Sequence, residues 1–190
     1  MMKTLVQAVI MLLFVMSCST YKPLTEAQRR ELQAWGTEKA FVIESDWAKP
    51  MPTAALNAIA NTGILGLGNS AGSINILGNV NYFKMKGDTI EAHLPYYGER
   101  YIGGGYNYKT AIAFNDIPDS KEITWNEQKQ RAEMRFSIRQ EDDNEKYDIF
   151  ILIFPNKTTR IDVNSSERSY ITYEGKIKAL ASQEYFNVER

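Results

Sequence analysis

Short runs in which apolar and polar residues alternate recur from Val80 to Ala179, with turn-forming residues between them. Residues 131–138 show the pattern most clearly, because Ala132, Met134, Phe136 and Ile138 alternate with charged or polar residues. Successive side chains of a β-strand point to opposite faces, so such a run has one buried face and one wet face. The repeated pattern therefore predicts an antiparallel sheet.

Turn residues separate the expected strands, which lie at residues 41–47, 81–85, 89–94, 109–114, 122–125, 131–138, 147–154, 159–163 and 170–179. Lys86-Gly87-Asp88 predicts a tight turn between two of them. Residues 149–154 are apolar at every position, which predicts a central strand covered on both sides. The glycine-rich run at residues 66–72 could cradle a pyrophosphate only if a helix followed, and the absence of a helical pattern after it favours a loop.

A helix is expected at the start of the domain. Thr25 and Gln28 have the spacing of a capping box, in which each side chain accepts a hydrogen bond from the other residue's backbone. Ala27, Leu32 and Trp35 can share one apolar stripe, and the helix is expected to end between Gly36 and Lys39. The predicted fold is mainly β (α+β): an N-terminal helix packed on an antiparallel sheet of about eight strands, with a curved partial barrel as one form of that sheet. Residues 24–190 are expected to form a single domain.

The first 18 residues predict export. Lys3 precedes an uncharged apolar run at residues 5–15, which is too short to span a bilayer. A basic start, a short apolar run and small residues after it are typical of a secretory signal peptide, here residues 1–17. Ser17-Cys18 resembles the lipobox of bacterial lipoproteins, in which the Cys is lipidated and becomes the new N-terminus, although Met16 departs from the usual pattern. The alternative is an ordinary signal peptide with Cys18 near the cleavage site by chance.

Cys18 is the one cysteine of the chain, so no internal disulfide competes with lipidation. Two or more acyl chains anchor a protein stably, so the expected partner is a membrane, reached through Cys18 and a short tether at residues 18–23. Surface-exported lipoproteins of the Bacteroidota type carry acidic residues after the Cys. None follows Cys18 directly, which predicts a cell-envelope protein on the outer membrane facing the periplasm. The near-zero net charge of −1 indicates no nucleic-acid partner.

No catalytic constellation is visible, so an enzyme is not expected. The sole histidine, His93, lies inside an alternating run, where strand packing or surface exposure is favoured over catalysis. One His and one Cys give no metal-ligand spacing, and no cofactor is expected. The acidic segment at residues 139–145 lacks the spaced ligands of a calcium loop and is interpreted as a solvated turn.

The strongest candidate for a contact with a ligand or partner is a tyrosine-rich loop. Its candidate contact residues are Tyr96, Tyr97, Arg100, Tyr101, Tyr106 and Tyr108. Rigid aromatic rings with hydroxyl groups suit carbohydrate or peptide recognition. The alternative, which is favoured, is a glycine-rich hairpin whose tyrosines pack on the sheet. Asp88-Thr89-Ile90 also matches a short O-glycosylation pattern of exported Bacteroidota proteins, which makes Thr89 a candidate modification site.

Two motifs resemble a known family. Leu94-Pro95-Tyr96-Tyr97-Gly98 and the later Ser169-Tyr170-Ile171-Thr172-Tyr173-Glu174-Gly175 are similar to motifs of the domain-of-unknown-function family 4251 (DUF4251), small exported proteins of the Bacteroidota. The resemblance covers residues 41–178. It implies a mainly β envelope protein and implies no activity. The expected function is a lipid-anchored, periplasm-facing module that binds a ligand or interacts with another molecule. The alternative is an envelope assembly or structural factor that acts through a protein partner. A hydrolase is the third and least favoured possibility.

Overall fold

The computed structural model describes residues 24–38, 40–101, 110–139 and 145–180. Within these ranges the elements follow one another as α2 (Glu26–Glu38), β1 (Ala40–Pro50), α3 (Ala54–Asn61), β2 (Ile74–Asn75), β3 (Tyr82–Lys86), β4 (Thr89–Pro95), β5 (Ala111–Asp116), β6 (Ser120–Asn126), β7 (Arg131–Arg139), β8 (Lys146–Ile153), β9 (Thr158–Ser165) and β10 (Ile171–Ala179). None of the helices in these ranges is long and apolar enough to cross a membrane.

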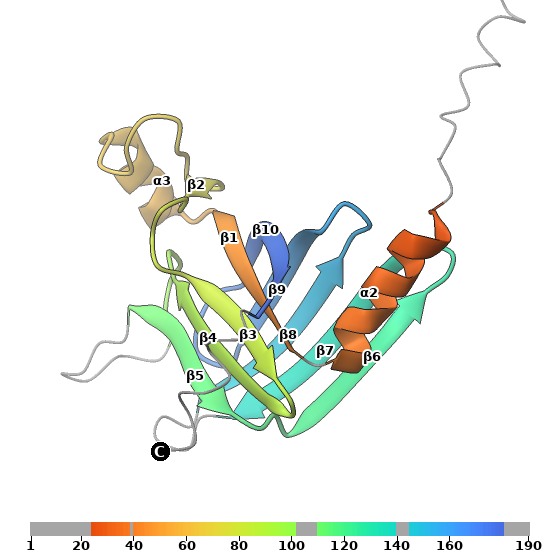
Figure 1. The fold of residues 1–190 in the computed structure, drawn as a ribbon. Helices are drawn as coiled ribbons and strands as arrows, with labels where there is room; N and C mark the ends of the chain where they lie inside the picture. Colours follow the sequence, from red (N-terminus) through yellow and green to blue (C-terminus); the bar gives the residue numbers. More distant parts are fainter. Residues whose placement is uncertain (1–23, 39, 102–109, 140–144, 181–190) are drawn as a thin grey trace, which may run out of the picture.

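Helix α2 begins at the predicted capping box. The backbone N–H of Thr25 donates to Gln28 Oε1 over 3.1 Å, and the N–H of Gln28 donates to Thr25 Oγ1 over 3.3 Å. Leu32 and Trp35 are buried, as the apolar stripe predicts, whereas Ala27 is exposed. The helix packs against β6 and β7 on the concave side of the sheet (Figure 1). The predicted helix on an antiparallel sheet is therefore confirmed.

The strands form one antiparallel sheet in the order β5-β4-β3-β1-β10-β9-β8-β7-β6, and β2 pairs with β1 outside this path. The middle of the sheet is the pairing of β1 with β10, where Phe41 lies opposite Ala179. On one side of this pair lie β3 to β5, and on the other lie β6 to β9. The sheet has more strands than the eight or so expected, and one of the additional strands, β2, has only two residues.

Curvature turns the sheet into a half-barrel whose inner face is the core (Figure 1). Side chains from the two halves of the sheet meet inside it: the ring of Phe83 lies 5.6 Å from that of Phe136, and the ring of Phe114 lies 5.7 Å from that of Tyr147. These aromatic contacts join β3 and β5 to β7 and β8. The core therefore lies between the two halves and under α2.

Strand β8 corrects one expectation about its cover. Its inner face is buried as predicted, but β8 lies third from the β6 edge, and α2 packs mainly against its neighbours β6 and β7. On the outer face Leu152 is buried and Phe150 is half-buried, with the guanidinium carbon of Arg135 lying 4.2 Å from the centroid of the Phe150 ring. Long side chains of neighbouring strands can cover apolar groups in this way while their charged ends stay in water.

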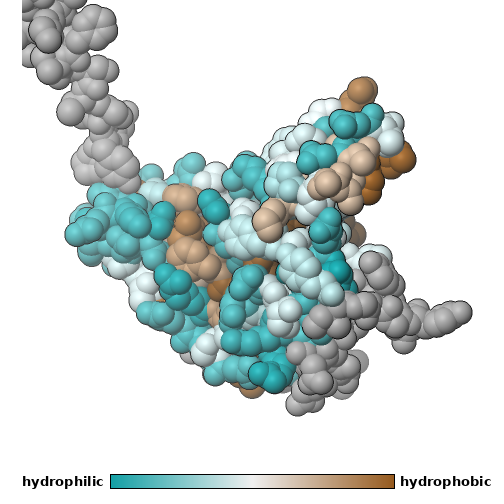
Figure 2. Space-filling view, turned by 180° about the vertical axis from the view of Figure 1, so that it is seen from behind, coloured by the Kyte–Doolittle hydropathy of each residue, from teal (hydrophilic) through white to brown (hydrophobic). Residues whose placement is uncertain are grey.

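Residues 51–80, between β1 and β3, contain α3 and β2 and project from the half-barrel (Figures 1 and 2). Helix α3 was not predicted. Thr53 caps it by accepting a hydrogen bond from the N–H of Leu56 over 3.2 Å. The glycine-rich run after it leads into the short strand β2, so the loop prediction for residues 66–72 is confirmed. We call residues 51–80 the apolar arm.

Candidate functional site

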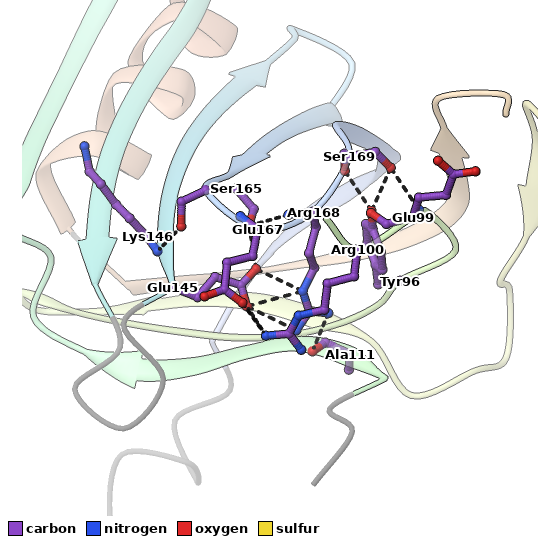
Figure 3. Close-up of polar contacts among 11 residues, drawn as sticks. Tyr96, Glu99, Arg100, Ala111, Glu145, Lys146, Ser165, Glu167, Arg168 and Ser169 are labelled. Atoms are coloured by element: carbon purple, nitrogen blue, oxygen red, sulfur yellow. Dashed lines mark hydrogen bonds and ion pairs between the residues drawn. The ribbon is translucent and has the colours of Figure 1, made fainter. Parts of the chain in front are cut away.

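The two sequence motifs meet in the structure. The backbone N–H of Ser169 donates to the carbonyl oxygen of Glu99 over 2.9 Å, and that of Tyr101 donates to Glu167 over 2.7 Å. The segment after β4 therefore runs beside the segment between β9 and β10 (Figure 3). We call residues 96–101 and 165–169, together with Glu145, the motif junction.

Tyr96 connects the two segments of the motif junction. Its hydroxyl oxygen lies 2.7 Å from Oγ of Ser169 and 2.8 Å from the carbonyl oxygen of Glu99. The guanidinium carbon of Arg168 lies 5.2 Å from the centroid of the Tyr96 ring. Burial raises the pKa of Tyr96, so the phenol stays protonated and can donate a hydrogen bond. These contacts give Tyr96 a structural role in the first motif.

Close backbone approach explains the last glycine of each motif. A Cβ on Gly98 would overlap the Tyr96 hydroxyl and Oγ of Ser169. A Cβ on Gly175 would overlap the carbonyl group of Glu44, beside the irregularity in β1 where the register shifts after Ser45. Only glycine leaves room for these approaches, which connects both motif glycines to the fold.

A buried ion pair lies at the centre of the motif junction. Nε of Arg168 lies 2.9 Å from Oε1 of Glu145, and Nη2 lies 3.3 Å from Oε2, so the guanidinium meets both carboxylate oxygens (Figure 3). The side chains are 2 % and 0 % exposed. Burial raises the pKa of Glu145, but hydrogen bonds from Ser165, Tyr147 and Arg168 outweigh burial and hold that pKa below its ordinary value. Glu145 is therefore an anion at neutral pH.

Further contacts connect this ion pair to other parts of the sheet. Nη1 of Arg168 donates to the carbonyl oxygen of Ala111, the first residue of β5, over 3.3 Å. Nη2 of Arg100 lies 2.5 Å from a carboxylate oxygen of Glu167 and 3.6 Å from one of Glu145. The positive charges of the two arginines thus compensate the negative charges of the two glutamates. The motif junction holds β5, β8 and β9 together at one end of the half-barrel.

The contact residues predicted from the sequence differ in how buried and how tightly held they are in the structure. Tyr97 is half-buried and packs against the core, as Tyr96 does, and Arg100 is held in ion pairs. Tyr101, at the surface of the motif junction, is 64 % exposed and is available for a contact. Tyr106 and Tyr108 lie outside the described residues. Ligand binding by this tyrosine group therefore stays a prediction.

The remaining singled-out residues lie apart from the motif junction. Thr89 is half-buried and follows the predicted Gly87-Asp88 turn, at the start of β4. His93 is exposed on β4, with its ring 6.2 Å from that of Tyr82. Cys18 lies outside the described residues. Within the described part of the chain, no three His, Cys, Asp or Glu side chains are grouped as metal ligands.

A second site, not predicted from the sequence, lies on the outer face of the sheet. It is an open recess of about 460 Å³. We call it the outer recess. Its outward-facing lining residues come from β6 to β9 and from the second motif: Ser120, Arg135, Ser137, Asp148, Phe150, Asp162, Asn164 and Tyr170. Within the second motif, Ser169 is thus part of the motif junction, while its neighbour Tyr170 lines the outer recess.

Hydrogen bonds between side chains order one wall of the outer recess. Asp162 accepts hydrogen bonds from Nε of Arg160 over 2.8 Å and from Oγ1 of Thr172 over 2.7 Å. The hydrogen bond with Asp162 raises the pKa of Arg160, so this cation persists at any accessible pH. Nη2 of Arg160 also lies 3.4 Å from the Tyr170 hydroxyl. This wall is therefore positioned before any ligand binds.

The opposite part of the outer recess combines an apolar ring with charged groups. Arg135 covers Phe150, and Asp148 forms an ion pair with Lys146 over 3.2 Å. The recess therefore offers guanidinium and hydroxyl donors, carboxylate and amide acceptors, and an aromatic surface. The sequence signal was weak: Phe150 is one residue of the apolar run at residues 149–154, and Tyr170 is part of the second motif.

Comparison with known protein families identifies a match. The family model described as "Domain of unknown function (DUF4251)" matches residues 24–177. No curated protein matches the chain. The matched range contains α2 and nearly all of the sheet, and it includes both motifs of the resemblance. Because the match covers well over half of the chain, the protein belongs to the DUF4251 family.

Proposed function

We propose that this protein is a non-catalytic binding module of the cell envelope, anchored by lipid on Cys18 and facing the periplasm from the outer membrane. Its ligand is a small polar molecule with donor and acceptor groups, such as a saccharide or a short peptide. It binds in the outer recess.

The outer recess carries this proposal. On the outer face of the sheet, the recess joins the Phe150 ring to Arg135, Asp148 and Tyr170 within about 460 Å³. Small-molecule sites are concave and combine apolar surface with a few placed polar groups. The hydrogen bonds of Asp162 fix part of the lining in advance, which reduces the entropy lost on binding.

The location rests on the first 18 residues. Lys3, the apolar run at residues 5–15 and the lipobox-like Ser17-Cys18 support export and lipidation. Membership of a family with no assigned activity is compatible with any periplasmic role. Radiolabelled fatty acid incorporated into wild-type protein and absent from a Cys18→Ser variant would support the anchor. Equal labelling of both proteins would refute it.

One observation favours a second function, that of an assembly factor with a protein partner. Among the described strands, β6 stands at one end of the sheet order and pairs with β7 alone. An edge strand can accept an extended segment of another protein through backbone hydrogen bonds. The exposed Tyr101 of the motif junction offers such a partner a separate contact.

Native mass spectrometry of the full-length protein, extracted gently from its own envelope, separates the two functions. A reproducible extra mass of small-molecule size supports the binding module. A co-purifying polypeptide supports the assembly factor. If preparations that retain the mass of the lipid contain neither an extra small molecule nor a co-purifying polypeptide, both proposed functions are refuted.

Matched variants then locate the bound molecule. Phe150→Ala removes the ring and the surface beneath Arg135, so we expect the extra mass to disappear. Tyr101→Ala removes an exposed ring from the sequence-predicted contact group and should leave that mass unchanged. The reverse result would move the ligand from the outer recess to the tyrosine group. Circular dichroism of both variants checks that each is folded.

A further inference from the structure

The apolar arm has an unusual composition. No Asp, Glu, Lys, Arg or His occurs between Lys49 and Lys84, although 24 % of the whole chain is charged. Most of the large hydrophobic side chains that the described residues expose lie in the apolar arm: Met51, Ile59, Ile64, Leu67, Leu77 and Val80. Leu67 is fully exposed and Ile64 is 77 % exposed. The arm thus offers water an apolar surface with no charged side chain of its own. At its base, Leu77 and Val80 line a recess together with charged residues of the body: Glu44, Asp46, Lys84 and Lys178.

The backbone of the apolar arm makes many of its hydrogen bonds within the arm and to the strand beside it. Thr53 caps the start of α3, and the N–H of Thr62 at its other end donates to carbonyl groups of the same helix. The Asn69 side chain donates to the carbonyl of Leu65 and accepts from the N–H of Asn75. The short strand β2 pairs with Trp47 and Ala48 of β1. Such internal pairing is what a backbone needs before it can leave water.

The arm is also firmly attached to the body. Ile74 and Ile76 belong to the buried core cluster, and the Asn81 side chain exchanges hydrogen bonds with the backbone of Ser45. These contacts hold the base of the arm against the body, while Ile64 and Leu67 are exposed. Figure 2 shows the hydrophobic residues of this part gathered on a projection at one end of the molecule.

The start of the described chain faces the same side of the molecule. In Figure 1 the helix α3 lies at the upper left and the first turn of α2 at the upper right, on opposite edges of the half-barrel, while the turn between β5 and β6 lies at the lower side. Six residue steps separate Leu24 from Cys18. Fully extended, they reach about 20 Å. A lipid on Cys18 would therefore hold this side of the protein close to a bilayer.

We infer that the apolar arm is a membrane-contact site that inserts Ile64, Leu67 and their apolar neighbours into the surface layer of a lipid bilayer. Helix α3 has eight residues and is about 12 Å long, so the arm enters the interface and does not cross the hydrocarbon layer, which is about 30 Å thick. Since the arm has no charge, its insertion depends on apolar burial and requires no anionic headgroup.

A bilayer fits the arm better than a protein partner does. Protein interfaces surround an apolar centre with a polar and partly charged rim, which gives them orientation and selectivity. The apolar arm has only Asn, Ser, Thr and Gly as polar residues over its whole length. A lipid surface makes no demand for a specific charged contact.

Site-specific labels test the inference independently of the anchor and of the outer recess. The full chain with Cys18→Ser, which cannot be lipidated on that residue, receives Leu67→Cys with an environment-sensitive fluorophore. A second protein carries the label at Ile117→Cys, an exposed apolar position 63 % accessible in the turn between β5 and β6. The probes are phosphatidylcholine vesicles, with and without a quencher on the acyl chains, and iodide in the water phase.

The expected result is a blue shift and acyl-chain quenching at position 67, with protection from iodide, and none of these at position 117. Added salt should leave the result unchanged. Ile64→Glu should weaken this insertion at least about tenfold, whereas Ile117→Glu should not. Because the apolar segment at residues 5–15 can attach the whole protein to vesicles, binding alone does not show that the arm is inserted. The fluorescence of each label reports only the surroundings of its own position.

Three results would overturn the inference. Vesicle-bound protein whose label at position 67 stays open to iodide would show that the arm remains in water. Protein that does not bind vesicles at all would contradict it as well. Shielding of position 67 that grows with protein concentration in the absence of lipid would assign the surface to a second copy of the chain.

Discussion

The buried pair of Arg168 and Glu145 makes the strongest energetic prediction. Replacing Arg168 with Met keeps most of the side-chain volume and removes the charge, so Glu145 is left buried without its main partner. Removing one member of a buried ion pair typically costs about 3–5 kcal/mol. In this variant Glu145 keeps two other contacts, because Nη2 of Arg100 lies 3.6 Å from its carboxylate and Ser165 donates a hydrogen bond to it. The expected loss in the free energy of unfolding is therefore near the lower limit, about 3 kcal/mol.

The assay is denaturant unfolding, with the free energy of unfolding taken from the midpoint and slope. Three variants complete a thermodynamic cycle: Arg168→Met, Glu145→Gln and the double variant. Because the double variant leaves no uncompensated charge in the pair, we expect it to lose about 1–3 kcal/mol less than the sum of the single losses. Lys178→Met is the control, since Lys178 pairs with Glu44 on the surface with both side chains more than half exposed.

A loss below about 1 kcal/mol for Arg168→Met would refute the reasoning, because that is what an exposed ion pair contributes. Strict additivity of the two single losses would also refute it, since it would mean that the two charges do not compensate each other in the folded protein.

Three further predictions concern stability. The folded pKa of Glu145 lies below its ordinary value of 4.5, so its contribution is present above that value and is lost as pH falls through the folded pKa. In unfolding measurements, the free-energy difference between the wild type and Glu145→Gln should therefore narrow below about pH 4.5 and stay constant above it. Gly175→Ala should cost at least about 2 kcal/mol in thermal unfolding, because its Cβ meets the carbonyl of Glu44. Gly87→Ala, where space is open but φ is +62°, should cost about 1 kcal/mol, and equal losses would contradict the overlap argument. Thr25→Ala should lower the free energy of unfolding by about 1 kcal/mol through loss of the α2 cap, and no loss in denaturant unfolding would show that the capping box adds nothing.

Local signals in the sequence predicted much of the fold. The capping box of Thr25 and Gln28, the Gly87-Asp88 turn and the alternation of β7 each depend on residues a few positions apart. Such features express backbone preference and one-sided burial, which are visible in a short window. The predicted helix on a curved antiparallel sheet followed from them.

The buried charges could not be predicted in this way. Glu145 ends a run of polar residues that was interpreted as a solvated turn, and the structure buries it completely. This interpretation of Glu145 was wrong because its partner, Arg168, comes from the segment between β9 and β10, 23 positions later. A charged residue is expected in water unless a partner is known, and no local pattern indicated this one.

Helix α3 and the outer recess were missed for different reasons. Helix α3 has only eight residues and lies between prolines and glycines, so Thr53 was a capping signal without a long apolar stripe. The outer recess takes its lining from several strands, and only the register of those strands brings Arg135 beside Phe150. Register between neighbouring strands is a property of the assembled sheet.

The central pairing of β1 with β10 has a consequence for how the protein folds. Phe41 and Ala179 are neighbours in the sheet although almost the whole domain separates them along the chain. Closing so long a loop before the contact forms slows folding, and sheets dominated by such contacts fold in milliseconds to seconds. During synthesis, the middle of the sheet cannot form until the last strand has left the ribosome. A chain that stays open until it is complete suits the proposed export, in which folding follows passage across a membrane.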